Sequence, residues 1–355
     1  NEEMGRIQAV LGKLASTNAW AYCFQRLSED QRVHLQAWER AVRRIGKGTG
    51  KYANQHRRAA REHIAHCQPA IPSWIMPLYR VAESIRPGDN RFDVAIIDES
   101  SQSGPEALVL LFLADRIVVV GDDKQISPDP FTRVEDVNRL RKEYIADLPA
   151  NDALTPENSF FDIARIRYPA RVRLIEHFRC MPEIIQFSND LCYKSEPLAP
   201  LRQFGAGRIE PVVNTVLVDG ASTKGRTQKT NPKEAAAIAR KVFELIKDSR
   251  YEGKSLGVVS LLGSRQARLI ENEIRSLVDA RELYARSLVC GEAYAFQGDE
   301  RDVMFLSLVS APGPDSRIGV LGKAADERRF NVAMSRAKDQ VWLFHSATIN
   351  DLSPN

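Results

Sequence analysis

The stretch on which the interpretation of the chain rests is Phe92-Asp93-Val94-Ala95-Ile96-Ile97-Asp98-Glu99-Ser100-Ser101-Gln102. Four apolar residues, Val94 to Ile97, follow one another without alternation and end at two adjacent carboxylates. Such a run, mostly β-branched, is typical of a strand buried on both faces of a parallel sheet. Ligands of these sheets bind beyond the carboxyl ends of the strands, where Asp98 and Glu99 fall. The pair suggests a divalent metal and an activated water, although an isolated Asp-Glu pair is more often a solvated acidic turn.

A second strand of the same kind, Ile117 to Val120, follows about twenty residues later and ends in Gly121-Asp122-Asp123-Lys124-Gln125-Ile126-Ser127-Pro128. That spacing allows one short crossover helix between two parallel strands, and a segment beginning at Pro105 suits this helix. Both strands therefore deliver polar groups at their carboxyl ends.

The composition limits the class of protein and the number of domains that the chain can form. At 355 residues, with 43% hydrophobic and 27% charged residues, the chain is an ordinary globular sequence with room for two or three domains. A net charge of +4 permits a nucleic-acid partner without demanding one. No apolar run approaches the length of a membrane span and no signal peptide opens the sequence, so we expect no membrane association.

The five cysteines are odd in number and scattered, and none forms a Cys-x-x-Cys pair. We therefore expect a reducing, cytoplasmic location rather than a disulfide framework or a zinc ribbon. His63, His66 and Cys67 lie close together in the sequence. Because no second ligand cluster is present to close a tetrahedral site, we do not expect a metal there.

Residues 40–66 form the most basic part of the chain. Within them, Gly46-Lys47-Gly48-Thr49-Gly50-Lys51-Tyr52 resembles a phosphate-binding loop but lacks the required glycine spacing and the hydroxyl that holds magnesium. We interpret it as a flexible basic turn that either contacts a phosphate backbone or is simply solvated.

The order of patterns predicts three parts: a helical, basic segment at 1–70, an incomplete first α/β domain at 71–167, and a second α/β domain at 168–355. In the last part strands and helices alternate, which favours a doubly wound parallel sheet. The strands are expected at 171–175, 212–218, 256–261, 303–309 and 340–344, and the helices at 182–191, 232–247, 265–278 and 324–337.

Three clusters in the second domain carry chemically useful residues. They are Leu174 to Pro182 with Arg179, Ala293 to Val303 with Gly298 and Glu300, and Arg328 to Ala337 with Arg329 and Arg336. Each cluster alone is weak evidence for a functional site, since most arginines on helices are solvated or form ion pairs at the surface.

Together and in this order, the five segments resemble motifs II to VI of a superfamily 1 helicase, closest to the branch of 5′-to-3′ translocases and the RNA-surveillance helicase. The resemblance covers residues 92–345. It implies tandem RecA-like P-loop domains with parallel sheets, the first one incomplete, in an ATP-dependent nucleic-acid helicase or translocase.

For the first domain the resemblance implies that Asp98 holds Mg²⁺ through water and that Glu99 orients or deprotonates the attacking water. Gln125, with both a donor and an acceptor, would sense the γ-phosphate. These roles define catalytic and ATP-binding candidates at the edge of the first sheet.

For the second domain the resemblance implies that Arg179 and Arg336 act as arginine fingers on the phosphates. Gly298 and Glu300 would contribute to nucleotide binding. ATP would then act as a clamp that couples hydrolysis to movement.

The expected partner is single-stranded DNA or RNA, and we expect a monomer, either alone or fused to further domains. The basic segment 40–66 and the loop 220–231, with Lys224, Arg226 and Lys229, are candidates to contact it.

Three departures from the family pattern matter. No Walker A loop precedes the first strand, so we expect a fragment cut within the first domain and inactive by itself. Ser100 replaces a common alanine, and Leu261-Leu262 replaces the usual Pro-Tyr. The alternative is a catalytically inactive RecA-like scaffold or nucleic-acid-binding module that has lost ATP chemistry.

Overall fold

The computed structural model describes residues 2–46, 48–85, 91–126, 134–205, 207–222, 229–296, 298–313, 318 and 322–352. The chain divides into two compact units, which are described separately. Unit 1 comprises residues 1–121 and 132–161, and unit 2 comprises residues 122–131 and 162–355. No helix within the described ranges has the length and apolar character needed to cross a membrane.

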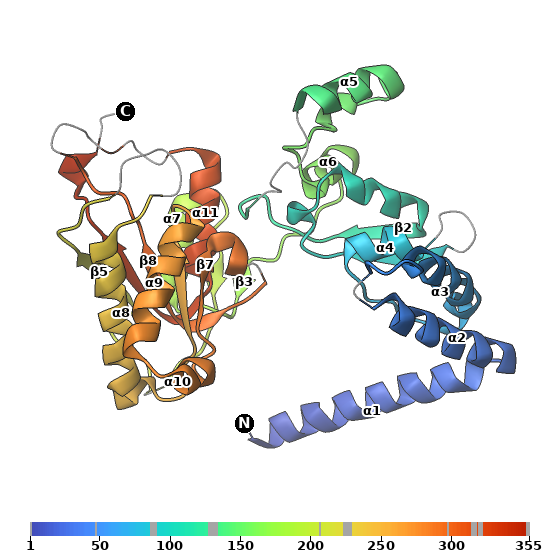
Figure 1. Cartoon of the computed structure of the whole chain (residues 1–355), viewed down its shortest axis with the longest axis horizontal. Helices are drawn as coiled ribbons and strands as arrows, with labels where there is room; N and C mark the ends of the chain where they lie inside the picture. The colour runs from blue at the N-terminus through green and yellow to red at the C-terminus, as the bar shows by residue number, and fades with distance from the viewer. Residues whose placement is uncertain are drawn as a thin grey trace. The chain divides into compact units, whose positions relative to one another are not determined.

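Unit 1 opens with three helices, α1 (Glu2–Arg26), α2 (Glu29–Ile45) and α3 (Ala53–Cys67) (Figure 1). The predicted helical segment at the N-terminal end is thus confirmed. The side chain of Ser28 accepts a hydrogen bond from the Gln31 backbone N–H and so starts α2 with a capping box. Most apolar side chains of α1, such as Val10, are exposed, whereas Cys23 near its C-terminal end is buried.

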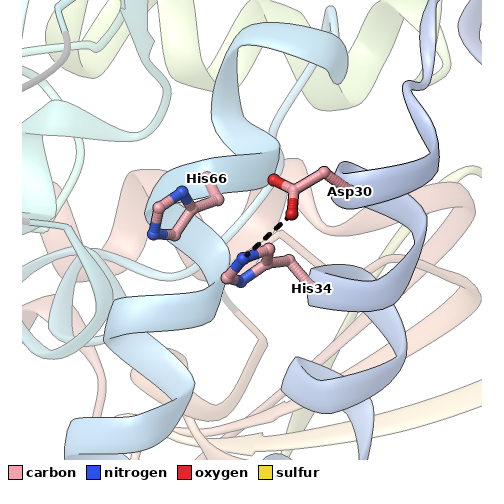
Figure 2. Close-up of side chains that lie close together, drawn as sticks. All are labelled: Asp30, His34 and His66. Carbon is pink, nitrogen blue, oxygen red and sulfur yellow. Dashed lines mark ion pairs between the residues drawn. The ribbon is translucent and has the colours of Figure 1, made fainter.

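Helices α2 and α3 lie side by side and bury Ala41, Ala60 and Ile64 between them. This pairing also brings polar side chains together, since Asp30 and His34 of α2 face His66 of α3 (Figure 2).

The sheet of unit 1 consists of β1 (Phe92–Ile97) and β2 (Ala114–Val119), which pair in parallel with Ile97 opposite Val119. The predicted pair of parallel strands is confirmed. Their connection contains the 3₁₀ helices η2 (Ser100–Gln102) and η3 (Pro105–Phe112), where we expected an α-helix.

The prediction that β1 is buried on both faces is wrong. Ile97 is buried against Leu110 and Phe160, but Val94 and Ile96 are 42% and 70% exposed. Neighbouring side chains of a strand point to opposite faces, so only the face that carries Ile97 is covered in the described part of unit 1. An unbroken apolar run therefore did not distinguish one covered face from two.

The remaining elements of unit 1 are short. They are η1 (Gln68–Ala70), α4 (Leu78–Ser84), α5 (Val134–Tyr144), η4 (Asn151–Ala153) and the start of α6 (Phe160–Arg167), whose last six residues belong to unit 2.

Unit 2 is built on a five-stranded, entirely parallel sheet of strand order β5-β9-β8-β6-β7. The strands are β5 (Val213–Leu217), β6 (Leu256–Ser260), β7 (Val289–Glu292), β8 (Arg301–Ser307) and β9 (Ala337–His345). Parallel strands require crossover connections, and helices supply them. The predicted α/β class with parallel sheets is confirmed.

Helices cover both faces of this sheet. One core joins Val258 and Phe305 to α8 (Pro232–Lys247), α9 (Ser264–Leu277) and α10 (Ala280–Ala285). The other core joins Val259 and Leu306 to α7 (Pro182–Cys192) and α11 (Ala324–Ser335). Successive strand residues thus face opposite cores, which explains the unbroken apolar runs of β6 and β8.

The strand predicted at 171–175 is wrong. The strand β3 contains only Glu176 and His177 and pairs with β4 (Ala199–Pro200), while Val172 and Leu174 are 90% and 81% exposed. Among the elements that were not predicted are β4, β7 and α10; all three are short, and β7 also contains a glycine. The 3₁₀ turns η5 (Ser249–Tyr251), η6 (Ala293–Phe296) and η7 (Ile349–Asp351) complete the unit.

A buried carboxylate fastens the first turn of α8 to the ends of two strands. Glu234 is fully buried, and its Oε2 accepts hydrogen bonds from Ser307 Oγ at 2.7 Å and Val309 N at 2.9 Å. Its Oε1 accepts from Ser346 Oγ at 2.8 Å and from Asn231 Nδ2 at 3.3 Å. Burial raises the pKa of Glu234 above its usual value, against the effect of these donors.

Replacing Glu234 by alanine should lower the free energy of unfolding by about 2–4 kcal/mol, because several buried donors lose their acceptor. Glu244→Ala on the same helix is the control, since Glu244 is exposed and forms a surface ion pair with Lys241; it should cost less than about 1 kcal/mol. Urea unfolding of the two variants measures both values, and equal losses would show that the buried network contributes nothing special.

Candidate functional site

In unit 1 the end of β1 is fixed beside the end of β2. The backbone N–H and the hydroxyl of Ser100 both donate to the carbonyl of Val120, at 2.9 and 2.6 Å. A Cβ at Gly121 would lie 2.8 Å from Ser100 Oγ and 2.9 Å from Phe161 Cδ2, so only glycine fits at this close approach. The serine that departs from the family pattern therefore has a structural role.

Asp98 and Glu99 form the turn directly after β1. Glu99 has a φ of +51°, a left-handed conformation that is uncommon for a residue with a side chain and is retained where its surroundings hold it. Its backbone N–H donates to Asp98 Oδ1 at 2.9 Å, and Gln102 Nε2 donates to Glu99 Oε2 at 3.0 Å. Asp98 is exposed to solvent. A carboxylate in this setting can offer oxygen to a hydrated magnesium ion.

In unit 2 the candidate residues gather because β8 and β9 start side by side. Arg301 pairs with Ala337, and the Arg301 N–H donates to the carbonyl of Arg336 at 2.9 Å. Glu300 and Arg336 each stand one residue before these strands and so occupy the same edge of the sheet. The Met181 N–H donates to the carbonyl of Lys338 at 2.9 Å, which brings the Arg179 segment to that edge as well.

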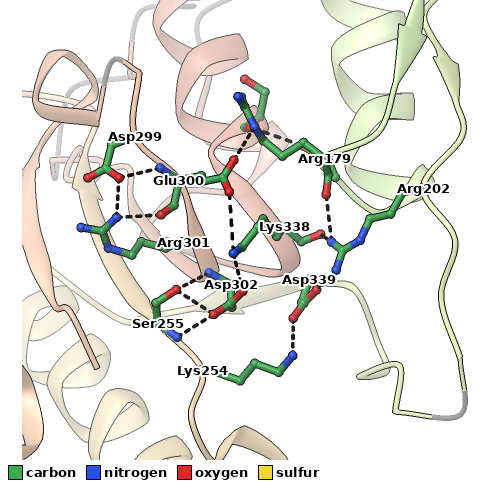
Figure 3. Close-up of polar contacts among 12 residues, drawn as sticks. Arg179, Arg202, Lys254, Ser255, Asp299, Glu300, Arg301, Asp302, Lys338 and Asp339 are labelled. Atoms are coloured by element: carbon green, nitrogen blue, oxygen red, sulfur yellow. Dashed lines mark hydrogen bonds and ion pairs between the residues drawn. The ribbon is translucent and has the colours of Figure 1, made fainter. Parts of the chain in front are cut away.

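Glu300 lies between two cations (Figure 3). Its Oε2 is 2.7 Å from Arg179 Nε, and its Oε1 is 3.7 Å from Lys338 Nζ. Lys338 in turn lies 2.9 Å from Asp302 Oδ1, and this pairing raises the pKa of the lysine. Sequence reasoning named Arg179 and Glu300 separately, and the structure joins them in one ion pair.

Arg202 supports the same edge from the loop after β4. It donates to the carbonyl of Arg179 at 2.9 Å and pairs with Asp339, which also binds Lys254 at 2.7 Å. This chain of contacts holds the backbone on which Arg179 is mounted (Figure 3).

Gln125 and Arg336 form the second contact. Arg336 ends α11, is 3% exposed, and its Nη2 donates to Gln125 Oε1 at 3.2 Å. The neighbouring Ile126 is buried in the same core as Cys180, which anchors the Gln125 segment to unit 2. A buried guanidinium needs polar partners, and the amide oxygen of Gln125 is one of them.

Three residues that sequence reasoning missed surround this contact. Tyr193 OH donates to Asp122 Oδ2 at 2.6 Å, and burial together with Asp122 raises the pKa of Tyr193. Asn331 Nδ2 donates to Tyr193 OH at 3.1 Å and to the carbonyl of Lys124 at 3.0 Å. Asp122 and Asn331 lie inside motif segments and could have been chosen on that ground, whereas nothing in the sequence marks Tyr193.

The thiol of Cys180 links the two contacts. It is fully buried and donates to the carbonyl of Ser335 at 3.3 Å. Burial raises its pKa to about 12, while the positive charges of Arg179, Arg202 and Arg336 oppose that rise. Their shared effect on one thiol places these arginines in a single electropositive neighbourhood.

The remaining residues predicted from the sequence include Gly298 and Arg329. Gly298 has a φ of +74° with open space around it, which suits a glycine turn. Arg329 forms an ion pair with Asp326 within α11, at 3.2 Å. Of the residues proposed from sequence, Lys47, Ser127, Pro128, Lys224, Arg226 and Gln297 lie outside the described residues.

Residues 157–348, more than half of the chain, match a protein family described as AAA domain. An uncharacterised ATP-dependent helicase of Mycoplasma pneumoniae is 29% identical over 319 residues, which cover 83% of this chain and 27% of that protein. The DNA replication ATP-dependent helicase/nuclease of Xenopus laevis is 26% identical over 90% of this chain and 30% of its own length. The regulator of nonsense transcripts 1 homologue of Neurospora crassa is 26% identical over 70% of this chain and 22% of its own.

The chain thus spans about a quarter of the length of the Mycoplasma relatives it matches, 27% and 26%. The activities of these full-length proteins are therefore not assigned to this chain by similarity alone.

A pH-sensitive group, His177, lies two residues before Arg179 in the sequence. His177 Nε2 accepts a hydrogen bond from the Cys180 N–H at 3.1 Å, so the ring is neutral and carries its proton on Nδ1. Burial, with the charge of Arg179, lowers the pKa of His177 from 6.5 to about 4. Between pH 6.5 and about pH 4, the His177 imidazole therefore binds a proton in the unfolded chain but stays neutral in the folded chain.

The protein should accordingly lose stability as the pH falls from 6.5 toward 4, by less than the roughly 1.4 kcal/mol per pH unit of a fully buried group, because solvent screens the half-buried ring. His177→Gln keeps an acceptor for the Cys180 N–H but cannot titrate, so its stability should fall less between pH 7 and pH 5. Urea unfolding at the two pH values measures the difference, with His56→Gln as the control. The same decline in His177→Gln and the parent chain would contradict the assignment.

Proposed function

The chain belongs to the AAA domain family of superfamily 1 helicase-like proteins, and from this premise we propose that the intact protein hydrolyses ATP to move along single-stranded DNA or RNA. The observation that supports this proposal best is the hydrogen bond between Gln125 and Arg336, at the edge where Arg179 meets Glu300. Phosphoryl transfer requires positioned positive charge and a residue that registers the γ-phosphate, and these side chains supply both.

Asp98 and Glu99 act on the phosphate end of ATP. Asp98 is exposed at the end of β1, and its carboxylate would hold Mg²⁺ through water, which suits an ion that keeps much of its hydration shell. When bound, the ion neutralises charge on the β- and γ-phosphates. Glu99, held by Gln102, orients the attacking water and accepts its proton.

Arg336 and Arg179 neutralise the charge that develops on the transferred phosphate. Arg336 is nearly fully buried, so its charge is poorly solvated and a phosphate oxygen is a stronger acceptor than the Gln125 amide. Exchange of one acceptor for the other lets Gln125 register whether the γ-phosphate is present. Glu300 engages the Nε of Arg179, and the two terminal nitrogens of a guanidinium remain the groups suited to bidentate phosphate binding.

Glu300 and Gly298 complete the nucleotide contacts in unit 2. The Gly298 turn has space on its Cα, which suits a backbone that a ligand approaches closely.

Nucleic acid would bind through phosphate contacts of the basic segment 40–66. Arg40, Arg43 and Arg44 at the end of α2 are exposed, which fits a surface that contacts a phosphate backbone. The protein would act as a monomer in the cytoplasm, where its five cysteines, all free of disulfides, stay reduced.

Glu99→Gln in the full-length protein should lower ATP turnover stimulated by single-stranded nucleic acid by at least about 100-fold, because the amide cannot take the proton of water. Binding of ATP and of nucleic acid should remain. Glu135→Gln, on the exposed surface of α5, is the matched control and should keep full turnover.

Steady-state hydrolysis with and without a single-stranded oligonucleotide gives the comparison. Full activity in Glu99→Gln would remove the residue from the site. A parent protein that binds nucleic acid but hydrolyses no ATP would favour the inactive scaffold instead.

A further inference from the structure

Unit 1 contains a cluster of imidazole and carboxylate groups that the ATP chemistry does not use. It lies between α2 and α3, where Asp30 and His34 occupy one face of α2 at a spacing of four residues. His63 and His66 occupy one face of α3 at a spacing of three. Because the two helices pack against each other, these faces meet, and Figure 2 shows Asp30 and His34 pointing toward His66.

The separations within the cluster suit a shared ion better than direct hydrogen bonds. One ligand atom from each of Asp30, His34 and His66 lies within 4.8 Å of the others. His34 Nε2 is 3.8 Å from Asp30 Oδ1, which is too long for a hydrogen bond. Two ligands of one zinc-like ion lie roughly 3.3 Å apart, given bond lengths of about 2.0–2.2 Å. Small side-chain rotations therefore close the site.

The ring orientations require one adjustment. The rings of His34 and His66 stack with centroids 4.0 Å apart and planes at 22°. An imidazole binds a metal in the plane of its ring, so the two rings must splay to direct their lone pairs at one ion. Rotation about the broad χ2 torsion of histidine permits this without movement of either helix.

His63 completes the arrangement behind the ligands. Its Nδ1 lies 3.0 Å from Nδ1 of His34, so one of the two nitrogens must donate and the other accept. When His34 donates from Nδ1, its Nε2 carries the lone pair and faces Asp30. Ligating histidines are commonly held by such a hydrogen bond from the second ring nitrogen.

Cys67 takes no part as a ligand, although it is adjacent to His66 in sequence. It is fully buried, and its thiol lies 3.5 Å from the carbonyl oxygens of both Gln31 and His63. The sequence cluster His63, His66 and Cys67 therefore contributes only His66 as a candidate ligand. The ligands missing from that sequence cluster come from α2.

We propose that Asp30, His34 and His66 bind a divalent transition metal ion of the zinc class, with His63 as the residue that positions His34. Two imidazoles and one carboxylate form a ligand set that suits zinc-class ions better than magnesium, which prefers oxygen ligands. The Asp30 side chain is 76% exposed and that of His34 23%, so an ion can enter and keep a water as its fourth ligand. The bound ion links α2 to α3 and stabilises the helical part of unit 1.

Equilibrium dialysis of the 355-residue chain against Zn²⁺, in excess Mg²⁺ to occupy sites made of carboxylates alone, tests the proposal. The parent chain should bind one more zinc ion than Asp30→Asn, His34→Ala or His66→Ala, and zinc should raise the melting temperature of the parent but not of these three variants. His56→Ala, a change of the same type elsewhere on α3, should behave as the parent. His63→Ala should bind zinc roughly 10- to 100-fold more weakly.

Asp30→Asn keeps the test valid even if a histidine variant unfolds, because Asp30 is mostly exposed. Co²⁺ in place of Zn²⁺ should give a visible d–d absorption in the parent that is absent from Asp30→Asn. No zinc bound by the parent, or the same amount bound by the parent and by a folded Asp30→Asn or His66→Ala chain, would overturn the site. Unchanged affinity in His63→Ala would overturn the positioning role of His63.

Discussion

The parallel pairing of β8 with β9 is the constraint on which the candidate site of unit 2 depends. Because Arg301 stands opposite Ala337, the residues just before the two strands share one sheet edge, although they are far apart in the sequence. One is Glu300, the ion-pair partner of Arg179, and the other is Arg336, the donor to Gln125. A shift of this register would separate the two contacts, so the site depends on the buried core that fixes the sheet.

Unit 1 presents its candidates differently. Asp98 and Glu99 follow the carboxyl end of β1, whereas Glu300 and Arg336 precede the amino ends of their strands. The Asp98–Glu99 turn is held by a left-handed residue and by the close approach of Gly121 to Ser100. Local backbone geometry thus positions the carboxylates, while sheet register positions the arginines. These are separate physical causes, and a substitution can disturb either one without the other.

Sequence periodicity predicted the central strands β6 and β8 of unit 2 and the long helices that cover them, because both faces of these strands are buried and their sequences are largely apolar. It failed where burial is one-sided or absent, as at Ile96 and at Val172. The motif residues were identified by their order along the chain, but their partners were not, since a contact such as Gln125 with Arg336 spans 211 positions. Asp30 and His34 were missed for the same reason: their spacing marks one helix face, and only helix packing brings His66 opposite.

The proposed ATP chemistry requires Gln125 and Arg336 to act together on the γ-phosphate. A double-mutant cycle in the full-length protein measures this directly, from kcat for ATP hydrolysis in Gln125→Ala, Arg336→Lys and the combined variant. If both residues serve one phosphate contact, the combined variant should lose about as much as the worse single variant. Losses that multiply, or a Gln125→Ala variant with full turnover, would contradict it.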